Sequence, residues 1–398
     1  MRVLLSKIKA FIFGTYVMEF IYRIAFVKVS ASTSGYHVLL AAPGMGNIGD
    51  EAMLEAFVKN VRGEVAIVVR SDADYPTASI PAKVTHLPSL FYGSPFRAAL
   101  DIWRYARIVR GARSVSLVGA DIMDGAYSAD ASVRRALAVK YAARSGANAR
   151  VLGFSWNENP ASSALKSLKA AARAGVLLFP RDPASAARLT AAGCANLEQT
   201  SDIVFTSSDT TPLPTEISIP GNDFAVVNAS SFVARGVDST QSYIELIDSL
   251  HSFGLHVVLL PHVVRDGGDP TILREIYDSL GDDQKKKTLL IDRKLAPAQV
   301  RFLASKARLV VTGRMHLSVM SLRLGTPTAV VGTQGKVEGM MEMFGIKHLV
   351  VSPASISNGG LIEAATILLR DHDILRERIA ATLPQVVSRA ERNFSGLR

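Results

Sequence analysis

The chain reads RLVVTGRMHLSVMSLRLGTPTAVVG over residues 308–332. The apolar run before Gly313 predicts a buried strand, and the apolar spacing after it predicts a short helix. Arg314 and His316 would then lie on the turn where a parallel strand passes into a helix. Ligands bind at such strand ends in open α/β sheets, and the free N–H groups of a helix N-terminus attract anions. This stretch therefore predicts a site for a phosphate or a carboxylate.

The same unit of strand, turn and helix recurs along most of the chain. Buried strands are predicted at 36–42, 64–69, 114–118, 150–154, 176–179, 224–227, 256–260 and 289–291. Regular alternation of strands and helices predicts parallel, doubly wound α/β sheets. Two surface helices close the pattern, at 361–370 and 374–394, and Pro384 predicts a break or kink in the second.

A segment rich in Ser, Thr and Pro at 206–222 predicts a linker between two Rossmann-like domains. The expected organisation has a basic amphipathic N-terminal segment, an N-terminal domain, the linker, a C-terminal domain and a C-terminal helix. Their bounds are 1–34, 35–207, 208–222, 223–370 and 371–398.

Composition limits the classes of partner. The 398 residues carry a net charge of +10, which favours an anionic partner: a phosphorylated small molecule, an anionic membrane surface or nucleic acid. Nucleic acid fits least, because no basic run with interleaved aromatic residues occurs. The one cysteine, Cys194, excludes an intrachain disulfide, and no Cys/His spacing of a zinc site is present. No metal or cofactor is therefore expected.

Residues 1–30 differ from the rest of the chain. They carry five basic residues and one acid among many aromatic and aliphatic side chains. Glu19 and Arg23 interrupt the apolar run before it reaches the roughly 20 residues of a membrane span. Two interpretations stay open. The segment is either an amphipathic helix lying in a membrane interface or a helix packed on the domain surface or on a dimer partner.

Several further polar residues follow predicted strands. They are Gly46, Asn47, Gly49 and Asp50 in a glycine-rich loop, and Asp124, Arg181, Asn228 and His262. If the carboxyl ends of both sheets face a cleft between the domains, all of them face it with Arg314 and His316. Each also has a structural explanation: turn chemistry for the glycines, an ion pair with Asp182 or a neighbour for Arg181, and a loop position for His262.

Three motifs in this order resemble the polysaccharide pyruvyl transferase family. They are Gly46-Asn47-Ile48-Gly49-Asp50-Glu51, then Arg181-Asp182-Pro183-Ala184-Ser185, then Gly313-Arg314-Met315-His316 with Gly325-Thr326-Pro327 and Lys336. Pro261-His262 with Asp269 is similar to a fourth, weaker element. The resemblance covers roughly residues 36–350. The chain departs from the pattern at Gly313, where a serine is usual, at Met315, where a leucine is commoner, and near Gly119, where a glycine-rich stretch is usual.

The resemblance implies a two-domain fold known as GT-B and the transfer of a pyruvyl group from phosphoenolpyruvate onto two hydroxyls of a sugar. The product would be a cyclic ketal in a cell-envelope polysaccharide or glycolipid precursor, and phosphate would leave. The implied donor contacts are Arg181, Arg314, Met315, His316 and Lys336, in the C-terminal domain and at the end of a mid-chain strand. The glycine-rich loop, Asp124 and His262 would lie on the acceptor side or in the cleft.

His316, Arg314 and Asp50 are the expected catalytic residues. Two rival functions stay open: a sugar-nucleotide glycosyltransferase of the same fold, and a non-catalytic scaffold of envelope-polysaccharide assembly. A cytoplasmic location is expected, either free or peripheral on the inner face of the plasma membrane through residues 1–30, with a sugar acceptor that a lipid carries in the second case.

Overall fold

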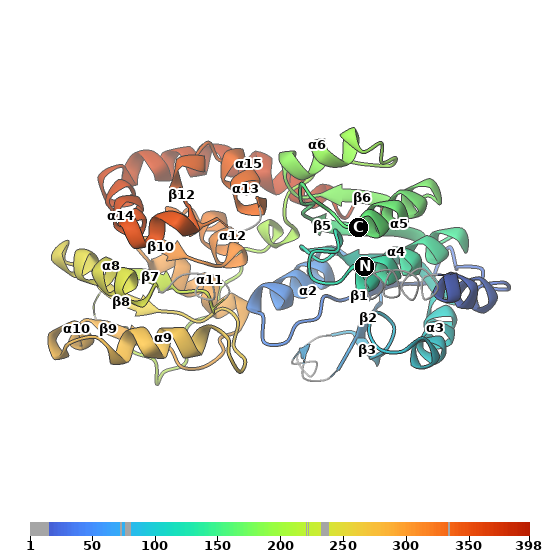
Figure 1. The fold of residues 1–398 in the computed structure, drawn as a ribbon, viewed down its shortest axis with the longest axis horizontal. Coiled ribbons are helices and arrows are strands. Elements are labelled where there is room, and N and C mark those ends of the chain that lie inside the picture. The colour runs from blue at the N-terminus through green and yellow to red at the C-terminus, as the bar shows by residue number, and fades with distance from the viewer. Residues whose placement is uncertain are drawn as a thin grey trace, which may run out of the picture. The chain divides into compact units, whose positions relative to one another are not determined.

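The computed structural model describes residues 16–398, apart from 72–73, 76–80, 220, 222, 232–238 and 333–334. Its contacts divide the chain into two units. The first holds the residues up to Pro43, Leu54–Ile203 and Glu391–Arg398, and the second holds Gly44–Met53 and Val204–Ala390. Each unit is built around one six-stranded sheet in which every neighbouring pair is parallel (Figure 1).

The first sheet has the order β3-β2-β1-β4-β5-β6. Its strands are β1 (Tyr36–Leu40), β2 (Val65–Val69), β3 (Lys83–His86), β4 (Ala112–Val118), β5 (Asn148–Phe154) and β6 (Leu177–Pro180). The helices of this part of the chain are α2 (Ile48–Asn60), α3 (Pro95–Arg110), α4 (Ala129–Arg144), α5 (Ser162–Arg173) and α6 (Pro183–Ala191). Strands β1 and β2 are rich in Val, Leu and Ile because a parallel sheet covered on both faces buries both sides of its inner strands, whereas the edge strand β3 is exposed at Lys83 and His86.

The second sheet has the order β12-β11-β10-β7-β8-β9, which repeats the topology of the first. Its strands are β7 (Phe224–Asn228), β8 (His256–Leu259), β9 (Thr288–Leu290), β10 (Leu309–Thr312), β11 (Thr328–Val331) and β12 (Val350–Val351). The helices are α8 (Thr240–Ser252), α9 (Asp269–Asp278), α10 (Asp282–Lys286), α11 (Pro297–Lys306), α12 (Met315–Arg323), α13 (Lys336–Met343), α14 (Gly360–Arg370) and α15 (His372–Arg392). The prediction of two doubly wound parallel sheets is confirmed.

The contact-defined units differ from the expected bounds in three places. The glycine-rich loop belongs to the second unit, because it pairs with residues 262–264. The expected linker packs on α11: the guanidinium of Arg301 donates to the carbonyl of Asp209 at 2.6 Å and to its carboxylate at 2.8 Å. The last eight residues belong to the first unit, where Arg150 donates to the carbonyl of Asn393 at 2.9 Å.

Helix α15 continues through Pro384, so of the predicted break or kink the break is wrong and the kink stays a prediction. A proline removes one N–H donor and clashes with the preceding turn, which bends a helix without always ending it.

Residues 16–25 of the N-terminal segment are helical and pack on the first unit. Met18 and Tyr22 are buried there, and Glu19 accepts a hydrogen bond from Lys140 of α4 at 2.6 Å. These residues therefore pack on the domain surface, as the second interpretation expects, and contact of their exposed face with a membrane stays a prediction. The first fifteen residues lie outside the described part of the chain. Within the described residues, no helix is both long and apolar enough to span a bilayer.

Candidate functional site

The polar cluster around Arg314 lies at the switch point of the second sheet. In that sheet the chain runs outward in opposite directions from β7 and β10, which are neighbours. Asn228 ends β7, and its carbonyl accepts the N–H of Gly313, which follows β10, at 3.1 Å. Ligands of open α/β sheets bind outside the strand ends at such a point. The topology therefore puts Arg314 and His316 where a ligand site is expected.

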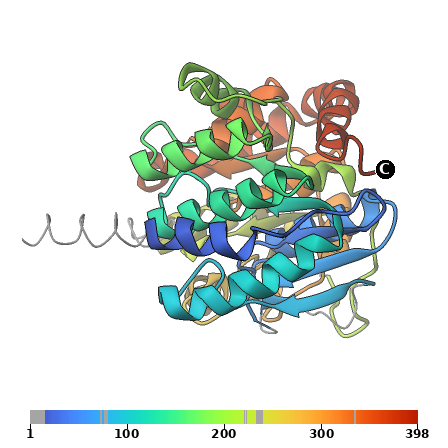
Figure 2. The same ribbon diagram turned by 90° about the vertical axis from the view of Figure 1, so that its right-hand side faces the viewer.

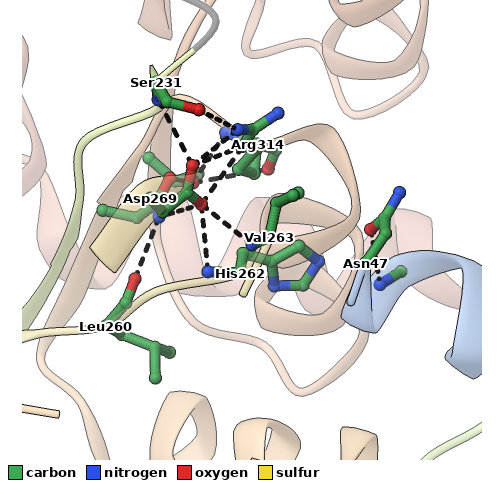
Figure 3. A network of polar contacts seen from close by, with 10 residues as sticks. Asn47, Ser231, Leu260, His262, Val263, Asp269 and Arg314 are labelled. Carbon is green, nitrogen blue, oxygen red and sulfur yellow. Dashed lines mark hydrogen bonds and ion pairs between the residues drawn. The ribbon is translucent and has the colours of Figure 1, made fainter. Parts of the chain in front are cut away.

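A buried carboxylate, Asp269 at the start of α9, anchors the guanidinium of Arg314. Nη2 of Arg314 donates to Oδ1 of Asp269 at 2.5 Å, and Nε donates to the same oxygen at 3.1 Å. Nη2 also donates to Oγ of Ser231 at 3.1 Å. Figure 3 shows these contacts on one edge of the guanidinium. Among the described contacts, Nη1 makes none, and the side chain of Arg314 is 19% exposed.

Asp269 also organises the backbone around it. Its Oδ2 accepts the N–H groups of His262 and Val263, both at 3.0 Å, and Nδ2 of Asn228 at 3.1 Å. Burial opposes ionisation of this carboxyl, but Arg314 and the N–H donors outweigh that cost and lower the pKa of Asp269. A carboxylate with this many donors stays ionised at neutral pH and fixes Arg314 in one orientation.

His316 lies in the first turn of α12 and packs directly on the glycine-rich loop. A Cβ atom at Gly49 would lie 2.3 Å from Nδ1 of His316 and 2.6 Å from its Cβ. Only a residue without a side chain fits there, so Gly49 is explained by the imidazole and not by a backbone turn. The N–H groups of Met315, His316 and Leu317 precede the first intrahelical bond, which Ser318 donates to the carbonyl of Arg314. The helix start therefore offers donors beside Arg314.

The glycine-rich loop forms a short antiparallel pairing with the segment that follows β8. Ile48 donates to the carbonyl of His262 at 3.0 Å, and Val264 donates to that of Gly46 at 2.9 Å. Gly46 has a φ of 77° and would place a Cβ 1.9 Å from the Val264 carbonyl. Asn47 accepts the N–H of Gly49 at 3.0 Å, and Asp50 accepts that of Gly44 at 3.2 Å. The loop glycines thus allow close contact with protein segments.

His262 is a buried histidine whose ring nitrogens have no hydrogen-bond partner among the described residues. Burial, with the nearby His316 as a second cause, lowers the pKa of His262 to about 3. Its imidazole is therefore neutral at physiological pH. Figure 3 shows the ring turned toward Asn47 and away from Asp269.

Arg181, in the first unit, is buried and held by other groups of that unit. Its Nη1 donates to Oδ2 of Asp202 at 2.7 Å, and its Nε donates to Oγ of Ser155 at 2.9 Å. Arg181 therefore forms an ion pair, as one explanation predicted, and its partner is Asp202 and not Asp182. Asp182 instead caps α6 by accepting the N–H of Ser185 at 2.8 Å. The role of Arg181 in donor binding stays a prediction.

The remaining predicted residues have separate positions. Asp124 follows β4 in the first unit and is buried, with its carboxylate accepting the N–H groups of Ala126 at 2.9 Å and Asn157 at 3.2 Å. Lys336 is the first residue of α13, which follows β11, the strand next to β10. Across the described ranges, no group of three or more His, Cys, Asp or Glu side chains could hold a metal ion.

A small pocket, with room for about one water molecule and no sequence motif, opens beside the carboxyl ends of β1 and β2 in the first unit. Arg70, Tyr92 and Arg135 are among its lining residues. The guanidinium carbons of Arg70 and Arg135 lie 5.8 and 5.3 Å from the centre of the Tyr92 ring. Arg70 also pairs with Asp74 at 2.9 Å. Arg70 therefore has its own counter-ion, and Arg135 is buried against the rings of Phe91 and Tyr92.

Replacing Gly49 by alanine tests the contact with His316. The new methyl group must displace the imidazole, so we expect a loss of about 1–3 kcal/mol in the free energy of unfolding. Chemical denaturation measures this loss. Gly281→Ala is the matched control, because a Cβ there meets only Oε1 of Gln284 at 3.5 Å. Equal stability of the two variants would contradict the packing described here.

The buried His262 predicts a specific pH dependence of stability. Its pKa is depressed in the folded state, so below about pH 6.5 the unfolded chain binds a proton that the folded chain does not. Stability should therefore fall as the pH drops from about 6.5 toward 3, by up to about 1.4 kcal/mol per pH unit from this residue. His262→Leu should flatten the unfolding curve in that window, as urea titrations at successive pH values would measure.

His348, an exposed histidine of the same unit, supplies the control for that titration. His348→Leu should keep the slope of the parent protein. A His262→Leu curve parallel to the parent curve between pH 6 and 4.5 would contradict the burial of a neutral imidazole.

Solved structures of low sequence identity share the fold. MnaA of S. aureus, solved with UDP, has a TM-score of 0.60 and 12% identity, covering 90% of this chain and 93% of that one. A UDP-GlcNAc 2-epimerase from Neisseria meningitidis bound to UDP-GlcNAc has a TM-score of 0.57 and 12% identity, covering 90% and 98%. These similarities show a two-domain α/β fold of the GT-B type and nothing about the substrate.

Sequence comparisons give the family. The amylovoran biosynthesis protein AmsJ of Erwinia amylovora is 22% identical over 114 residues, and the match spans 28% of each protein. A family model described as polysaccharide pyruvyl transferase matches residues 47–335, which include the glycine-rich loop from Asn47 on, Arg181, Asp269 and the Arg314 turn. Because that match covers well over half of its length, the chain belongs to the polysaccharide pyruvyl transferase family.

Proposed function

We propose that this protein transfers a pyruvyl group from phosphoenolpyruvate to two hydroxyls of a sugar during the synthesis of a cell-surface polysaccharide or glycolipid. One observation carries the proposal most: a guanidinium fixed by a buried carboxylate lies at a helix N-terminus, at the switch point of the second sheet. Family membership supports the same reaction class.

The donor would bind where Arg314 and the start of α12 offer hydrogen-bond donors. Asp269 occupies one edge of the guanidinium, and Nη1 remains to donate to a carboxylate or phosphate oxygen. The N–H groups of Met315 and His316, with the positive end of the helix dipole, suit the second anionic group. Because Asp269 neutralises Arg314, we expect recognition to depend on directed hydrogen bonds more than on net charge. Lys336 would be a further phosphate contact.

The reaction needs one proton on the donor's methylene carbon, which becomes the methyl group of the ketal. One sugar oxygen then bonds to the adjacent carbon, and the second displaces phosphate. One hydroxyl proton replaces the proton given to the methylene carbon, and the other leaves with the phosphate. His316 is the proposed proton carrier, because an imidazole can both accept and donate a proton and this one lies in the first turn of α12, beside Arg314. The neutral His262 beside it would add no positive charge.

The acceptor would bind in the first unit. Family membership supports a sugar acceptor, and Arg70 and Tyr92 beside β1 and β2 would be candidate contacts for it. Asp50 and Asp124 are weaker candidates for the base that activates a hydroxyl, since both carboxylates are buried and accept backbone N–H groups of their own loops. Arg181 remains a predicted donor contact only through the family resemblance.

A nucleotide-sugar glycosyltransferase is the main rival, because solved structures with nucleotide ligands share the fold. It would bind a nucleotide sugar and ignore phosphoenolpyruvate. A non-catalytic scaffold would bind neither. Phosphate release from phosphoenolpyruvate with lipid-linked or nucleotide-linked sugars would identify the pyruvyltransferase, and a binding measurement with nucleotide sugars would separate the two rivals.

Arg314→Lys should weaken phosphoenolpyruvate binding at least tenfold, because the amine cannot satisfy Asp269 and the donor at once. Isothermal titration calorimetry measures the dissociation constant. Arg274→Lys is the matched control in the same unit, since the Arg274 side chain is 50% exposed and forms a long ion pair of 3.9 Å with Asp292. The control should bind the donor as the parent protein does.

Two results would count against the proposal. One is the absence of any phosphate release with every acceptor tested, together with no thermal stabilisation by phosphoenolpyruvate. A ligand at 100 times its dissociation constant stabilises a folded protein by about 2.7 kcal/mol, so real binding would be visible. The other is unchanged donor affinity in Arg314→Lys.

A further inference from the structure

Two helices of the first unit lie side by side and share one core. Residues 16–25 form the first, and α3 forms the second. The ring of Phe26, just after the first helix, lies 5.8 Å from that of Tyr105 in α3. Ser32 donates to the carbonyl of Ala112, two residues after α3, at 3.0 Å. Both helices therefore end near the amino end of β4 and run in the same direction, as Figure 2 shows in dark blue and cyan.

Both helices also expose large apolar side chains on the face away from the core. Phe96, Leu100 and Trp103 of α3 are 89%, 65% and 48% exposed. Their spacing places them on one stripe, opposite the buried Ile102 and Val109. The first helix exposes Tyr16, Phe20, Ile24 and, just beyond it, Val27, at 72%, 61%, 43% and 71%.

These seven residues make up most of the eleven large apolar side chains exposed in the described part of the chain. Monomeric proteins rarely gather exposed apolar side chains in this way unless the face binds something. Tyr and Trp among them are typical of membrane interfaces, where an amphipathic ring meets both water and lipid.

The exposed charges of the same two segments are all positive. They belong to Arg23, Lys28, Arg97, Arg104, Arg107 and Arg110. The two acids are paired. Glu19 bonds to Lys140 at 2.6 Å, and the buried Asp101 accepts the N–H of Ser89 at 2.7 Å and Nη1 of Arg104, whose side chain is still 63% exposed, at 3.3 Å. Apolar and aromatic side chains interleaved with Arg and Lys are the pattern of a helix that lies in an anionic interface.

We propose that this two-helix face, defined by residues 16–28 and α3, docks the protein on an anionic lipid bilayer. The apolar side chains would enter the interface, and the six cations would contact lipid headgroups. A second copy of the chain fits the face poorly, because a two-fold contact would set the six cations of one copy against those of the other. The proposal is independent of the transferase reaction and would place the enzyme beside lipid-carried acceptors.

Co-sedimentation of the full chain with vesicles tests the docking. Vesicles of phosphatidylglycerol and phosphatidylcholine should bind the protein, and vesicles of phosphatidylcholine alone should not. The triple variant Arg97→Gln, Arg107→Gln, Arg110→Gln should bind about 100-fold more weakly, since each cation contributes to attraction by anionic lipid. The matched control replaces Arg274, Arg293 and Arg376 of the second unit, all exposed, by Gln and should bind as the parent does. Equal binding of the two triple variants would overturn the proposal.

Trp103 reports whether this face enters the lipid. The chain has two tryptophans, and Trp156 is buried against Phe154, so Trp156→Phe leaves Trp103 as the single emitter. On anionic vesicles its emission should shift to shorter wavelength, and brominated lipids should quench it. Binding to vesicles without either change would assign the contact to another segment and overturn the proposal. So would sedimentation equilibrium without lipid that shows a dimer lost in the Arg97, Arg107, Arg110 variant.

Discussion

The buried carboxylate of Asp269 is the constraint on which the candidate site depends. One side chain joins the end of β7 through Asn228, the loop after β8 through the N–H groups of His262 and Val263, and the turn after β10 through Arg314. Breaking a buried ion pair by removing one partner leaves an uncompensated charge, at a cost of about 3–5 kcal/mol. The orientation of Arg314 is therefore part of the stability of the second unit.

The glycine-rich loop is the second element that this arrangement fixes. The loop pairs with residues 262–264, the segment whose N–H groups bond to Asp269. This pairing places Gly49 in contact with His316. Gly313, where the family usually has serine, has a comparable cause, since a Cβ there would lie 2.5 Å from the Cβ of Ser230. Both glycines are required by close contact between segments distant in sequence.

Much of the fold could be predicted from the sequence, because strands buried on both faces read as uninterrupted Val, Ile and Leu runs. Arg314, His316 and His262 could also be predicted as site residues, because each follows a predicted strand. The partners of the two arginines could not be predicted, since Asp269 and Asp202 meet them only through the packing of separate strands. A weak signal existed for Asp269: an acid followed by proline after two glycines is typical of a helix start. Residues 95–110 carry no motif, and only the structure separates their buried and exposed faces.

The most direct measurement of the central claim is a crystal structure of the protein with phosphoenolpyruvate. The account predicts that one anionic group of the donor accepts from Nη1 of Arg314 and the other from the N–H groups at the start of α12, while Asp269 keeps its contacts with Nε and Nη2. A donor bound away from the Arg314 turn, or one that displaces Arg314 from Asp269, would contradict it.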